Sequence, residues 1–370
     1  MIQARDRAGA AWVLLLSALG AIGCGSDTAN VGELTGESRR SNSTSSDGSG
    51  ASDGSATGGA SSTNSNNNSS SSSGSASSDD VGTASNTAGP LPPRACDIGD
   101  ALDSRWLVFD SDGGTSESER RIYAVESEGG TVPQPLTPQN VLASDPVLSP
   151  DGSELAYVAD GMVRVLNLNS GDDEGLVEGD QPAWSPNGRS LAYHADRGVW
   201  LFDVQERVSM ELATCPDCSL GGYQNPEFSH DGDVLVMDRE NQIELLELGT
   251  GEMHEVVENG KMSITHPTLS PDAGSVVAEL ECEPGFPSLW LYEAGETTLP
   301  CAGRRIDPGG SYTRPSWGPN SVIAFELSIP NVRAIVLLDM EADLGCALVM
   351  EGVNQNPSWA PHGWQPPDGD

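Results

Sequence analysis

The sequence has almost no basic side chains. Lys261 is the only lysine, and 18 Lys and Arg residues stand against 55 Asp and Glu residues, a formal net charge of −37. Residues 1–24 contribute +1 and residues 25–95 contribute −4, so about −34 falls on residues 96–370. Such an acidic domain repels nucleic acid and anionic lipid surfaces and favours basic partners or cations. A general role of this charge in solubility or salt adaptation is the alternative.

Signatures of catalysis are also missing from the sequence. It has no G-x-S-x-G nucleophile elbow. The Asp110-Ser111-Asp112-Gly113 stretch has the start of a calcium loop but lacks its downstream bidentate Glu, so calcium is kept only as a minor alternative. We therefore expect no enzyme and no cofactor, and assign no catalytic or metal-ligating residue. The five histidines are scattered, and His194, which follows a predicted strand, is the hardest of them to dismiss as a ligand: His194, His230, His254, His266 and His362.

No apolar run reaches the roughly 20 residues that a membrane-spanning helix needs. Arg5 and Arg7 precede a shorter apolar run that ends at Ile22, the arrangement of a secretory signal peptide. The following Gly23-Cys24 resembles the lipobox of bacterial lipoproteins, in which the cysteine is acylated, although Ala21 stands where Leu is usual. We predict a lipoprotein signal peptide over 1–23 and lipidation of Cys24. An ordinary secretory signal is the alternative.

Large apolar side chains are nearly absent from residues 24–95, which consist mainly of Ser, Gly, Asn, Thr and Asp. Such a segment cannot bury enough apolar area to offset its ordering entropy. We predict a disordered tether with a root-mean-square reach of roughly 45 Å. Gly25 and Ser26 carry no Asp retention signal, which favours the outer membrane over the inner one.

A repeated segment organises residues 96–370. It contains an anchor proline, an apolar residue two positions later and a turn of the Pro-Asp-Gly kind. Successive anchors are 36, 44, 41, 48 and 42 residues apart, a spacing typical of four-stranded propeller blades. The copies are DPVLSPDG (145–152), QPAWSPNG (181–188), NPEFSHDG (225–232), HPTLSPDA (266–273), RPSWGPNS (314–321) and NPSWAPHG (356–363).

The last copy lies too close to the end of the chain to complete its own blade. The missing strands occur at the start of the domain, as RWLVFDSD at 105–112 and RIYAVES at 121–127. We therefore predict an all-β, six-bladed propeller over 96–370, closed by a blade shared between both ends of the domain. The apolar residues two positions after the anchors should pack between blades: Leu148, Trp184, Phe228, Leu269, Trp317 and Trp359.

The unit P-x-W-S-P-D-G-x-x-[LI]-A-[YF], followed by an aromatic-rich strand, resembles the propeller repeats of TolB and its relatives. The resemblance covers essentially all of 96–370 and implies the propeller fold. TolB itself carries an α/β domain before its propeller and is periplasmic. Here a lipidated cysteine and a tether take that place, so its partnership with the Pal lipoprotein does not transfer directly.

Six cysteines remain for the propeller, and an exported domain favours disulfides. We label the strands of each blade A to D in chain order. The blade topology then predicts three bonds: Cys96–Cys346, Cys215–Cys218 and Cys282–Cys301. In the last pair, Cys282 is expected in the B–C connection of the fourth blade and Cys301 in its D–A connection. The second pair lies in the sequence CPDC, for which zinc binding or redox chemistry are weaker alternatives.

The rigid ring and the absence of catalytic signatures favour a monomeric scaffold that binds an envelope protein or peptide, touching the membrane only through its lipid. The contact surface is expected on the face that holds the B–C and D–A connections, at residues 213–224, 281–288 and 302–313. A carbohydrate-active lyase or glycosidase is the alternative, and it would require clustered histidines or paired acids.

Overall fold

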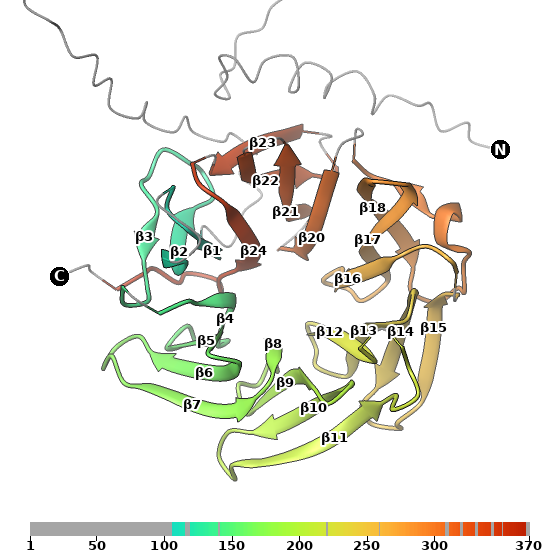
Figure 1. Cartoon of the computed structure of the whole chain (residues 1–370), viewed down its shortest axis with the longest axis horizontal. Coiled ribbons are helices and arrows are strands. Elements are labelled where there is room, and N and C mark those ends of the chain that lie inside the picture. The colour runs from blue at the N-terminus through green and yellow to red at the C-terminus, as the bar shows by residue number, and fades with distance from the viewer. Residues whose placement is uncertain are drawn as a thin grey trace, which may run out of the picture. The chain divides into compact units, whose positions relative to one another are not determined.

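The computed structural model describes residues 106–114, 119–139, 141–219, 221–258, 260–307, 311–318, 321–329, 332–341, 344–349 and 351–367. These residues form six four-stranded antiparallel sheets arranged as a ring, with one strand of each sheet innermost (Figure 1). The fold is a six-bladed β-propeller, as the repeats predict. The predicted signal peptide, the tether, Cys24 and Cys96 lie outside the described residues.

Five blades are continuous in sequence and the sixth is composite. Blade 1 contains β4 (Ser144–Leu148), β5 (Glu154–Ala159), β6 (Met162–Asn167) and β7 (Asp173–Glu178). Blade 2 contains β8 (Asp180–Trp184), β9 (Ser190–Ala195), β10 (Gly198–Asp203) and β11 (Val208–Thr214). Blade 3 contains β12 (Tyr223–Phe228), β13 (Val234–Arg239), β14 (Gln242–Glu247) and β15 (Met253–Val257).

Blade 4 contains β16 (Ile264–Leu269), β17 (Ser275–Glu283), β18 (Phe286–Glu293) and β19 (Arg304–Arg305). Blade 5 contains β20 (Ser311–Trp317), β21 (Val322–Ile329), β22 (Val332–Asp339) and β23 (Leu344–Val349). Blade 6 has the strand order β24 (Asn354–Trp359), β1 (Trp106–Ser111), β2 (Arg121–Glu126) and β3 (Gln134–Pro135).

Ring closure occurs where the sequence predicts it. β24 pairs antiparallel with β1, with Leu107 opposite Trp359 and Val108 opposite Ser358. The last described segment then continues onto blade 1, where the Trp364 indole Nε1 donates to the Gly152 carbonyl at 2.9 Å. Trp364 also packs edge-on against Trp106, with ring centroids 6.2 Å apart. The end of the domain therefore ties blade 6 to blade 1.

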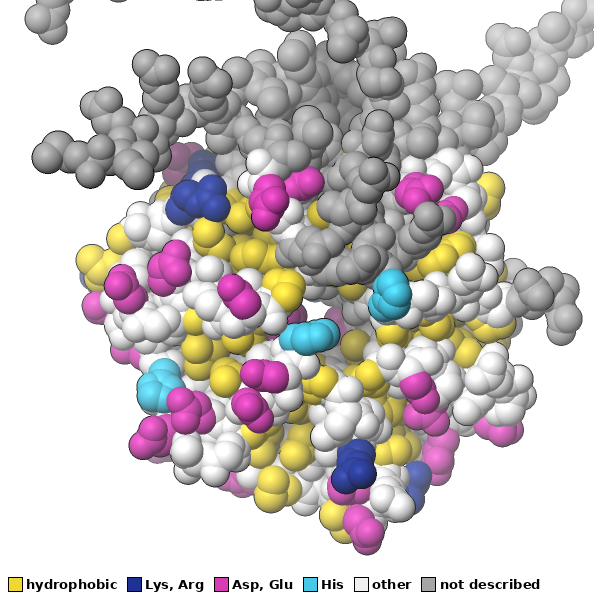
Figure 2. All heavy atoms as spheres, turned by 180° about the vertical axis from the view of Figure 1, so that it is seen from behind, with side chains coloured by type: hydrophobic (Ala, Val, Ile, Leu, Met, Phe, Trp, Pro, Cys, Tyr) yellow, Lys and Arg dark blue, Asp and Glu magenta, His cyan; other side chains and the backbone are white. Residues whose placement is uncertain are grey.

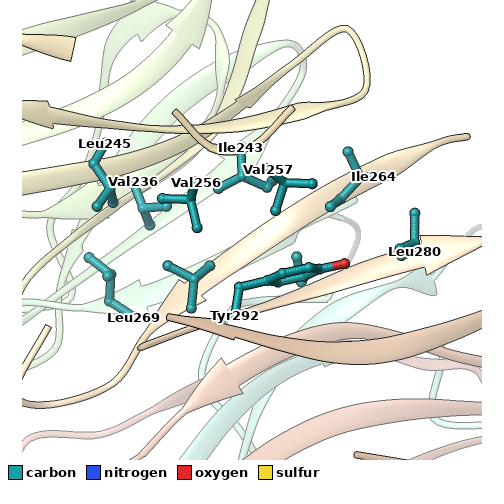
Figure 3. Close-up of a cluster of buried hydrophobic side chains, with 11 residues drawn as sticks. Val236, Ile243, Leu245, Val256, Val257, Ile264, Leu269, Leu280 and Tyr292 are labelled. Atoms are coloured by element: carbon teal, nitrogen blue, oxygen red, sulfur yellow. The ribbon is translucent and has the colours of Figure 1, made fainter. Parts of the chain in front are cut away.

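The core consists of six apolar clusters, each formed by two neighbouring blades. Figure 3 shows the cluster between blades 3 and 4, which includes Val236, Ile243, Leu269 and Tyr292. Each cluster also contains one of the six apolar residues that follow the anchor prolines, which confirms their predicted packing role: Leu148, Trp184, Phe228, Leu269, Trp317 and Trp359. Burial of apolar area between blades thus stabilises the ring.

The turns from A to B strands are held by one hydrogen-bond pattern. In blade 1, the Ser149 hydroxyl donates to the Asp151 carboxylate at 2.7 Å and accepts from the Glu154 backbone N–H at 3.0 Å. Gly152 follows with φ of 70°, a conformation that glycine adopts without penalty. The same serine-centred pattern recurs at Ser185, Ser229 and Ser270. The S-P-D-G sequence therefore encodes the turn locally.

Blade 4 departs from the expectation. Residues 281–288 were expected as a long connection, but β17 extends to Glu283 and β18 begins at Phe286, so only a tight turn separates them. Residues 302–313 contain the outer strand β19 and the start of β20. Both stretches have backbone hydrogen-bond partners across the sheet, which makes strand the more stable state. The expectation of long loops in these two stretches is therefore wrong, and the contact face stays a prediction.

Candidate binding site in the central channel

The innermost strands share an unusual backbone feature at the anchor. In every blade, the residue before the anchor proline has a φ between 49° and 53°, which is the left-handed region. These ring residues are Asp145, Gln181, Asn225, His266, Arg314 and Asn356. The register between the A and B strands shifts at the same place in all six blades. Each blade therefore carries a β-bulge there, of the kind that redirects side chains.

This backbone conformation is costly. A residue before proline normally adopts an extended conformation, and a non-glycine residue in the left-handed region costs of order 1–3 kcal/mol. Six copies of the same strain persist because the surrounding sheets impose it. Strained backbone of this kind is typical of functional sites.

The ring residues line a cavity of about 300 Å³ in the middle of the propeller. All six anchor prolines line it as well, together with Trp317 and Trp359. The cavity therefore has apolar walls interrupted by the six ring residues and by Glu227, Ser316 and Ser358. A concave, mostly apolar site with a few polar groups is typical of ligand-binding pockets, and the volume lies at their lower limit.

A second layer of side chains lies directly behind the ring. It comes from the B strand of each blade, at the position paired with the residue two before the anchor proline. Five of the six positions are titratable: Asp110, His194, Asp238, Glu279 and Glu326, with Val158 in blade 1. The channel is thus surrounded by a belt of mainly acidic groups.

The second layer connects neighbouring blades. The Asp238 carboxylate accepts from the His266 backbone N–H of the next blade at 3.2 Å. Glu279 accepts in the same way from Arg314 at 3.3 Å, and Glu326 from Asn356 at 3.0 Å. Each bond holds the bulged backbone of the following blade. These carboxylates therefore stabilise the strained ring conformation.

Most channel carboxylates also have a cationic or amide partner. Asp110 forms an ion pair with Arg120 at 2.6 Å and accepts from the Asn356 amide at 2.6 Å. The remaining partners link Glu326 to Arg314 at 3.2 Å, Glu279 to His266 at 3.2 Å, Asp180 to His194 at 2.7 Å, and Asp238 to the Asn225 amide at 2.7 Å. These contacts offset part of the cost of burying charge.

Burial nevertheless dominates the electrostatics of the belt. It raises the pKa of Asp110 to about 7, despite the opposing effect of Arg120. It raises the pKa of Asp238 to about 6, and it also raises that of Asp145. Charged carboxylates are disfavoured when they are removed from water. The channel can therefore gain protons near neutral pH.

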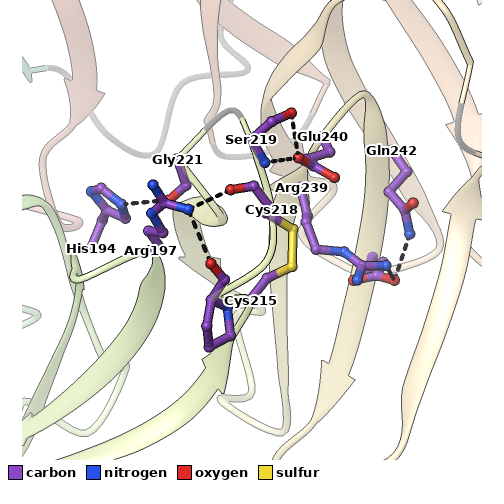
Figure 4. Close-up of a disulfide and its surroundings, with 11 residues drawn as sticks. His194, Arg197, Cys215, Cys218, Ser219, Gly221, Arg239, Glu240 and Gln242 are labelled. Carbon is purple, nitrogen blue, oxygen red and sulfur yellow. Dashed lines mark hydrogen bonds and ion pairs between the residues drawn. A yellow bond between two sulfur atoms is a disulfide. The ribbon is translucent and has the colours of Figure 1, made fainter.

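Figure 4 shows the connection between blades 2 and 3, where the Cys215–Cys218 disulfide closes a tight loop. The Arg197 guanidinium donates to the carbonyl oxygens of Pro216 at 3.0 Å and Cys218 at 2.7 Å. On the other side, Ser219 donates to the Glu240 carboxylate. The disulfide loop therefore bridges the B–C turns of two adjacent blades.

His194 links this loop to the channel. Its Nδ1 lies 2.7 Å from the Asp180 carboxylate and its Nε2 lies 3.3 Å from the Gly221 carbonyl oxygen. The hydrogen bond with Asp180 is the main cause that raises the pKa of His194. The histidine singled out from sequence is thus a second-layer residue that supports the loop.

The Cys282–Cys301 bond forms as predicted, with one topological difference, and the Cys96–Cys346 bond stays a prediction. Cys282 and Cys301 form a disulfide, and Cys346 is disulfide-bonded as well. The predicted partner of Cys346, Cys96, lies outside the described residues. Cys301 was expected in the D–A connection but lies in the short 3-10 helix Pro300–Ala302 before β19, in the C–D connection. The outer strand of blade 4 forms later in the chain than expected.

The other sequence-derived candidates occupy separate places. Asp112 is buried, and its carboxylate accepts from the backbone N–H groups of Gly114 at 2.9 Å and Val353 at 2.8 Å. Among the described residues, one group of three His, Cys, Asp or Glu side chains has metal-binding spacing: Glu247, Glu252 and His254. It lies on the outer β14–β15 hairpin, away from the channel. The described histidines therefore form no cluster of three.

The face seen in Figure 2 carries acidic side chains across most of its width and few basic ones. This distribution agrees with the strong negative charge of the sequence. Within the described part of the chain, no helix is long and apolar enough to cross a membrane.

The ring residues were not found from the sequence. Their positions are visible in the repeats, because a polar residue precedes every anchor proline. The identities differ from copy to copy, however, and the usual extended conformation before proline gives no indication of a bulge. The consistent polarity was the available signal.

These features define a six-bladed β-propeller with a strained polar ring around its channel. The fold is TolB-like. It is similar to TolB from Acinetobacter baumannii, with a TM-score of 0.60 and 17% identity over 71% of this chain and 68% of that one. It is also similar to a putative TolB from Agrobacterium tumefaciens, with a TM-score of 0.52 and 15% identity over 68% of this chain and 91% of that one.

A chain of a nidogen/laminin complex has a TM-score of 0.54 and 7% identity, over 69% of this chain and 98% of that one. No family model and no curated protein sequence matches the chain. At these identities the likeness shows the fold, and a fold supports many functions. The function has to be argued from the channel.

Proposed function

We propose that the protein is an envelope-anchored binding scaffold that holds a segment of another protein, or a peptide, in the central channel of its propeller. The observation that carries the proposal is the cavity of about 300 Å³ whose wall receives one strained polar residue from every blade. Strained backbone is typical of functional sites, and six strained residues lie around this one cavity. The cavity is therefore the most specialised surface of the protein.

The chemistry of the ring favours a peptide. Its six members are three amide side chains, one carboxylate, one imidazole and one guanidinium, so the ring has no rotational symmetry in charge or hydrogen bonding. A peptide is similarly asymmetric, and it offers donors, acceptors and apolar side chains along one direction. The prolines and Trp317 and Trp359 provide the apolar contact that such a segment needs.

The proposed location is the cell envelope. The N-terminal signal, the lipidation of Cys24 and the long polar tether predicted from the sequence support it, and so does the likeness to TolB structures. We place the protein at the outer membrane, as a monomer whose propeller stands off from the bilayer on the tether. Metabolic labelling with an alkyne fatty acid should mark the wild-type protein and leave Cys24→Ala unlabelled. Label retained by that variant would reject the anchor.

We propose binding without catalysis and without a cofactor. The ion pairs of the second layer support this, because Asp110, Glu279 and Glu326 each have a basic side chain in contact. The carbohydrate-active alternative would need clustered histidines or paired acids at equivalent strand positions.

Site-specific photo-crosslinking tests the binding function. A benzoylphenylalanine placed at Ser358, which lines the cavity, should yield a discrete protein or peptide adduct in native envelopes. The same group at Val208, exposed on the outer strand β11, is the matched control and should yield far less of it. Equal adducts at both positions, or none at Ser358, would reject the channel as the binding site.

A further inference from the structure

Asp145 differs from the other channel carboxylates in its partners. Among the described residues, it receives one hydrogen bond, from the hydroxyl of its neighbour Ser144 at 2.9 Å, and it forms no ion pair. It is partly buried and lines the cavity. By contrast, Asp110, Glu279 and Glu326 have basic partners in contact. Two carboxylates line the cavity itself. Glu227 accepts two hydrogen bonds from blade 4, whereas Asp145, among the described residues, accepts one from its own neighbour.

The groups around Asp145 are also mainly acidic. Asp110 on one side and Asp180 on the other are both acidic, and each disfavours a second negative charge nearby. The second-layer position of blade 1 is held by Val158, which supplies no donor. Arg314 also lines the cavity and, like His266, favours the charged form of Asp145 at longer range, but its ion pair is with Glu326. One arc of the ring, formed by blades 6, 1 and 2, therefore holds three carboxylates, of which Asp110 and Asp180 have a basic partner in contact.

We infer that the segment bound in the channel carries a cationic group, a Lys or Arg side chain or an N-terminal amine, which pairs with Asp145. This inference rests on the proposed binding function and adds the chemistry of the partner. A cation at this position supplies the missing counter-charge, and a charge-assisted hydrogen bond in a partly buried site is stronger than a neutral one. A partly buried carboxylate without a basic side chain in contact is unfavourable, so this position favours a cationic ligand.

The charge of the whole domain acts in the same direction. Residues 96–370 carry about −34, which raises the local concentration of cationic segments and accelerates their association. The long-range field attracts a basic partner, and Asp145 then selects the register in which it binds.

Peptide pools test this inference. Three labelled pools of random decapeptides, with a fixed central Lys, Met or Glu, are passed over the immobilised full-length protein. We expect the Lys pool to be retained about tenfold more than the Met pool, the size of one charged hydrogen bond. Asp145→Asn should remove this preference. Asp160→Asn is the matched control, because Asp160 is exposed on the same blade and also has a left-handed φ, of 55°.

A channel-filling variant distinguishes the preference for a cationic segment from channel binding itself. Ser316 lines the cavity and is partly buried, so Ser316→Phe should block binding of every pool. If all pools bind equally and Ser316→Phe abolishes their binding, the cationic preference is wrong and channel binding stands. If no pool binds, or if Ser316→Phe binds like the wild type, channel binding itself is wrong. Retention that disappears with EDTA and returns with calcium would assign Asp145 to a metal ion and overturn the inference.

Discussion

The side-chain amide of Asn356, near the end of the chain, donates to the Asp110 carboxylate on the first described strand at 2.6 Å. The same residue donates its backbone N–H to Glu326 on blade 5 at 3.0 Å. One asparagine thus connects the two ends of the domain within blade 6 and also joins blades 5 and 6. Closure of the ring therefore depends on polar contacts at the channel as well as on the pairing of β24 with β1.

Asn356→Asp tests this contact. Aspartate tolerates the left-handed backbone almost as well as asparagine, so the change mainly places a second carboxylate beside Asp110. We expect the free energy of unfolding to fall by about 1–3 kcal/mol at pH 8, from lost hydrogen bonding and repulsion. At pH 5 the loss should be smaller, because the pKa of Asp110 is about 7 and this carboxyl is protonated there. Urea unfolding at the two pH values measures both effects.

Asn169→Asp is the control for Asn356→Asp, since it adds the same charge at an exposed turn of blade 1. It should change the free energy of unfolding by less than about 0.5 kcal/mol. An equal effect of both substitutions would show that net charge, and not the contact with Asp110, is responsible.

The contact between Trp364 and Gly152 predicts a second result. A Cβ at Gly152 would lie 2.1 Å from Cδ1 of Trp364, and the φ of 70° disfavours any other residue. Gly161 has a similar φ of 73° with open space around it. Gly152→Ala should therefore lower the free energy of unfolding more than Gly161→Ala, which reports the backbone strain of about 1–2 kcal/mol alone. Thermal or urea unfolding measures both.

A double-mutant cycle isolates the clash. In a Trp364→Ala background, the effect of Gly152→Ala should shrink to that of Gly161→Ala, because the indole is no longer there to collide with. Equal effects of Gly152→Ala in both backgrounds would mean that Trp364 does not lie against this turn.

The carboxyl group of Glu227 should make the free energy of unfolding depend on pH. Burial raises its pKa to about 7, and its carboxylate accepts from Thr268 Oγ1 and the Leu269 N–H through the same oxygen. Between the unfolded pKa of 4.5 and about 7, the folded state holds more protons, so this residue lowers stability as the pH rises. Glu227→Gln keeps the accepting oxygen without the charge. It should increase the free energy of unfolding at pH 8, by up to about 3 kcal/mol, and have little effect at pH 4.

Asp231→Asn is the comparison for Glu227→Gln. Hydrogen bonds from Ser229 and the Asp233 N–H lower the pKa of Asp231, so its contribution to stability has the opposite sign. It stabilises the fold above the unfolded pKa, and the stabilisation is lost as the pH falls through the folded pKa. Asp231→Asn should therefore lower the free energy of unfolding at pH 8, whereas Glu227→Gln should raise it. A change in the same direction for both variants would contradict the opposite pKa shifts of the two residues.

The propeller and its closure were predictable because they depend on periodic, local signals. Each anchor is a proline with an apolar residue two positions later and a serine-centred turn, and the last copy lacks its partner strands. The missing strands could come only from the start of the domain, because an unpaired edge would remain otherwise. The pairing of Leu107 with Trp359 follows from that reasoning.

The channel ring was not predictable by the same rules. The residue before a proline is expected to be extended, yet Asp145 and its five counterparts are left-handed. The bulge arises because each innermost strand must pair along its sheet and still turn its side chains into a narrow channel, which is a tertiary requirement. Blade 4 shows a second limit, since the pairing of β17 with β18 extends into residues that were expected to form a connection.

His194 gives a last prediction, on the loop at the channel. Its bond to Asp180 raises its pKa above 6.5, so the protonated form stabilises the fold below that value and the stabilisation is lost as the pH rises through the raised pKa. His194→Gln should therefore destabilise the protein more at pH 5.5 than at pH 9. His230→Gln, at an exposed turn, should have little effect at either pH. If an NMR titration gave His194 a pKa below 6.5, the ion pair would be contradicted, because pairing with Asp180 stabilises the charged imidazole and raises its pKa.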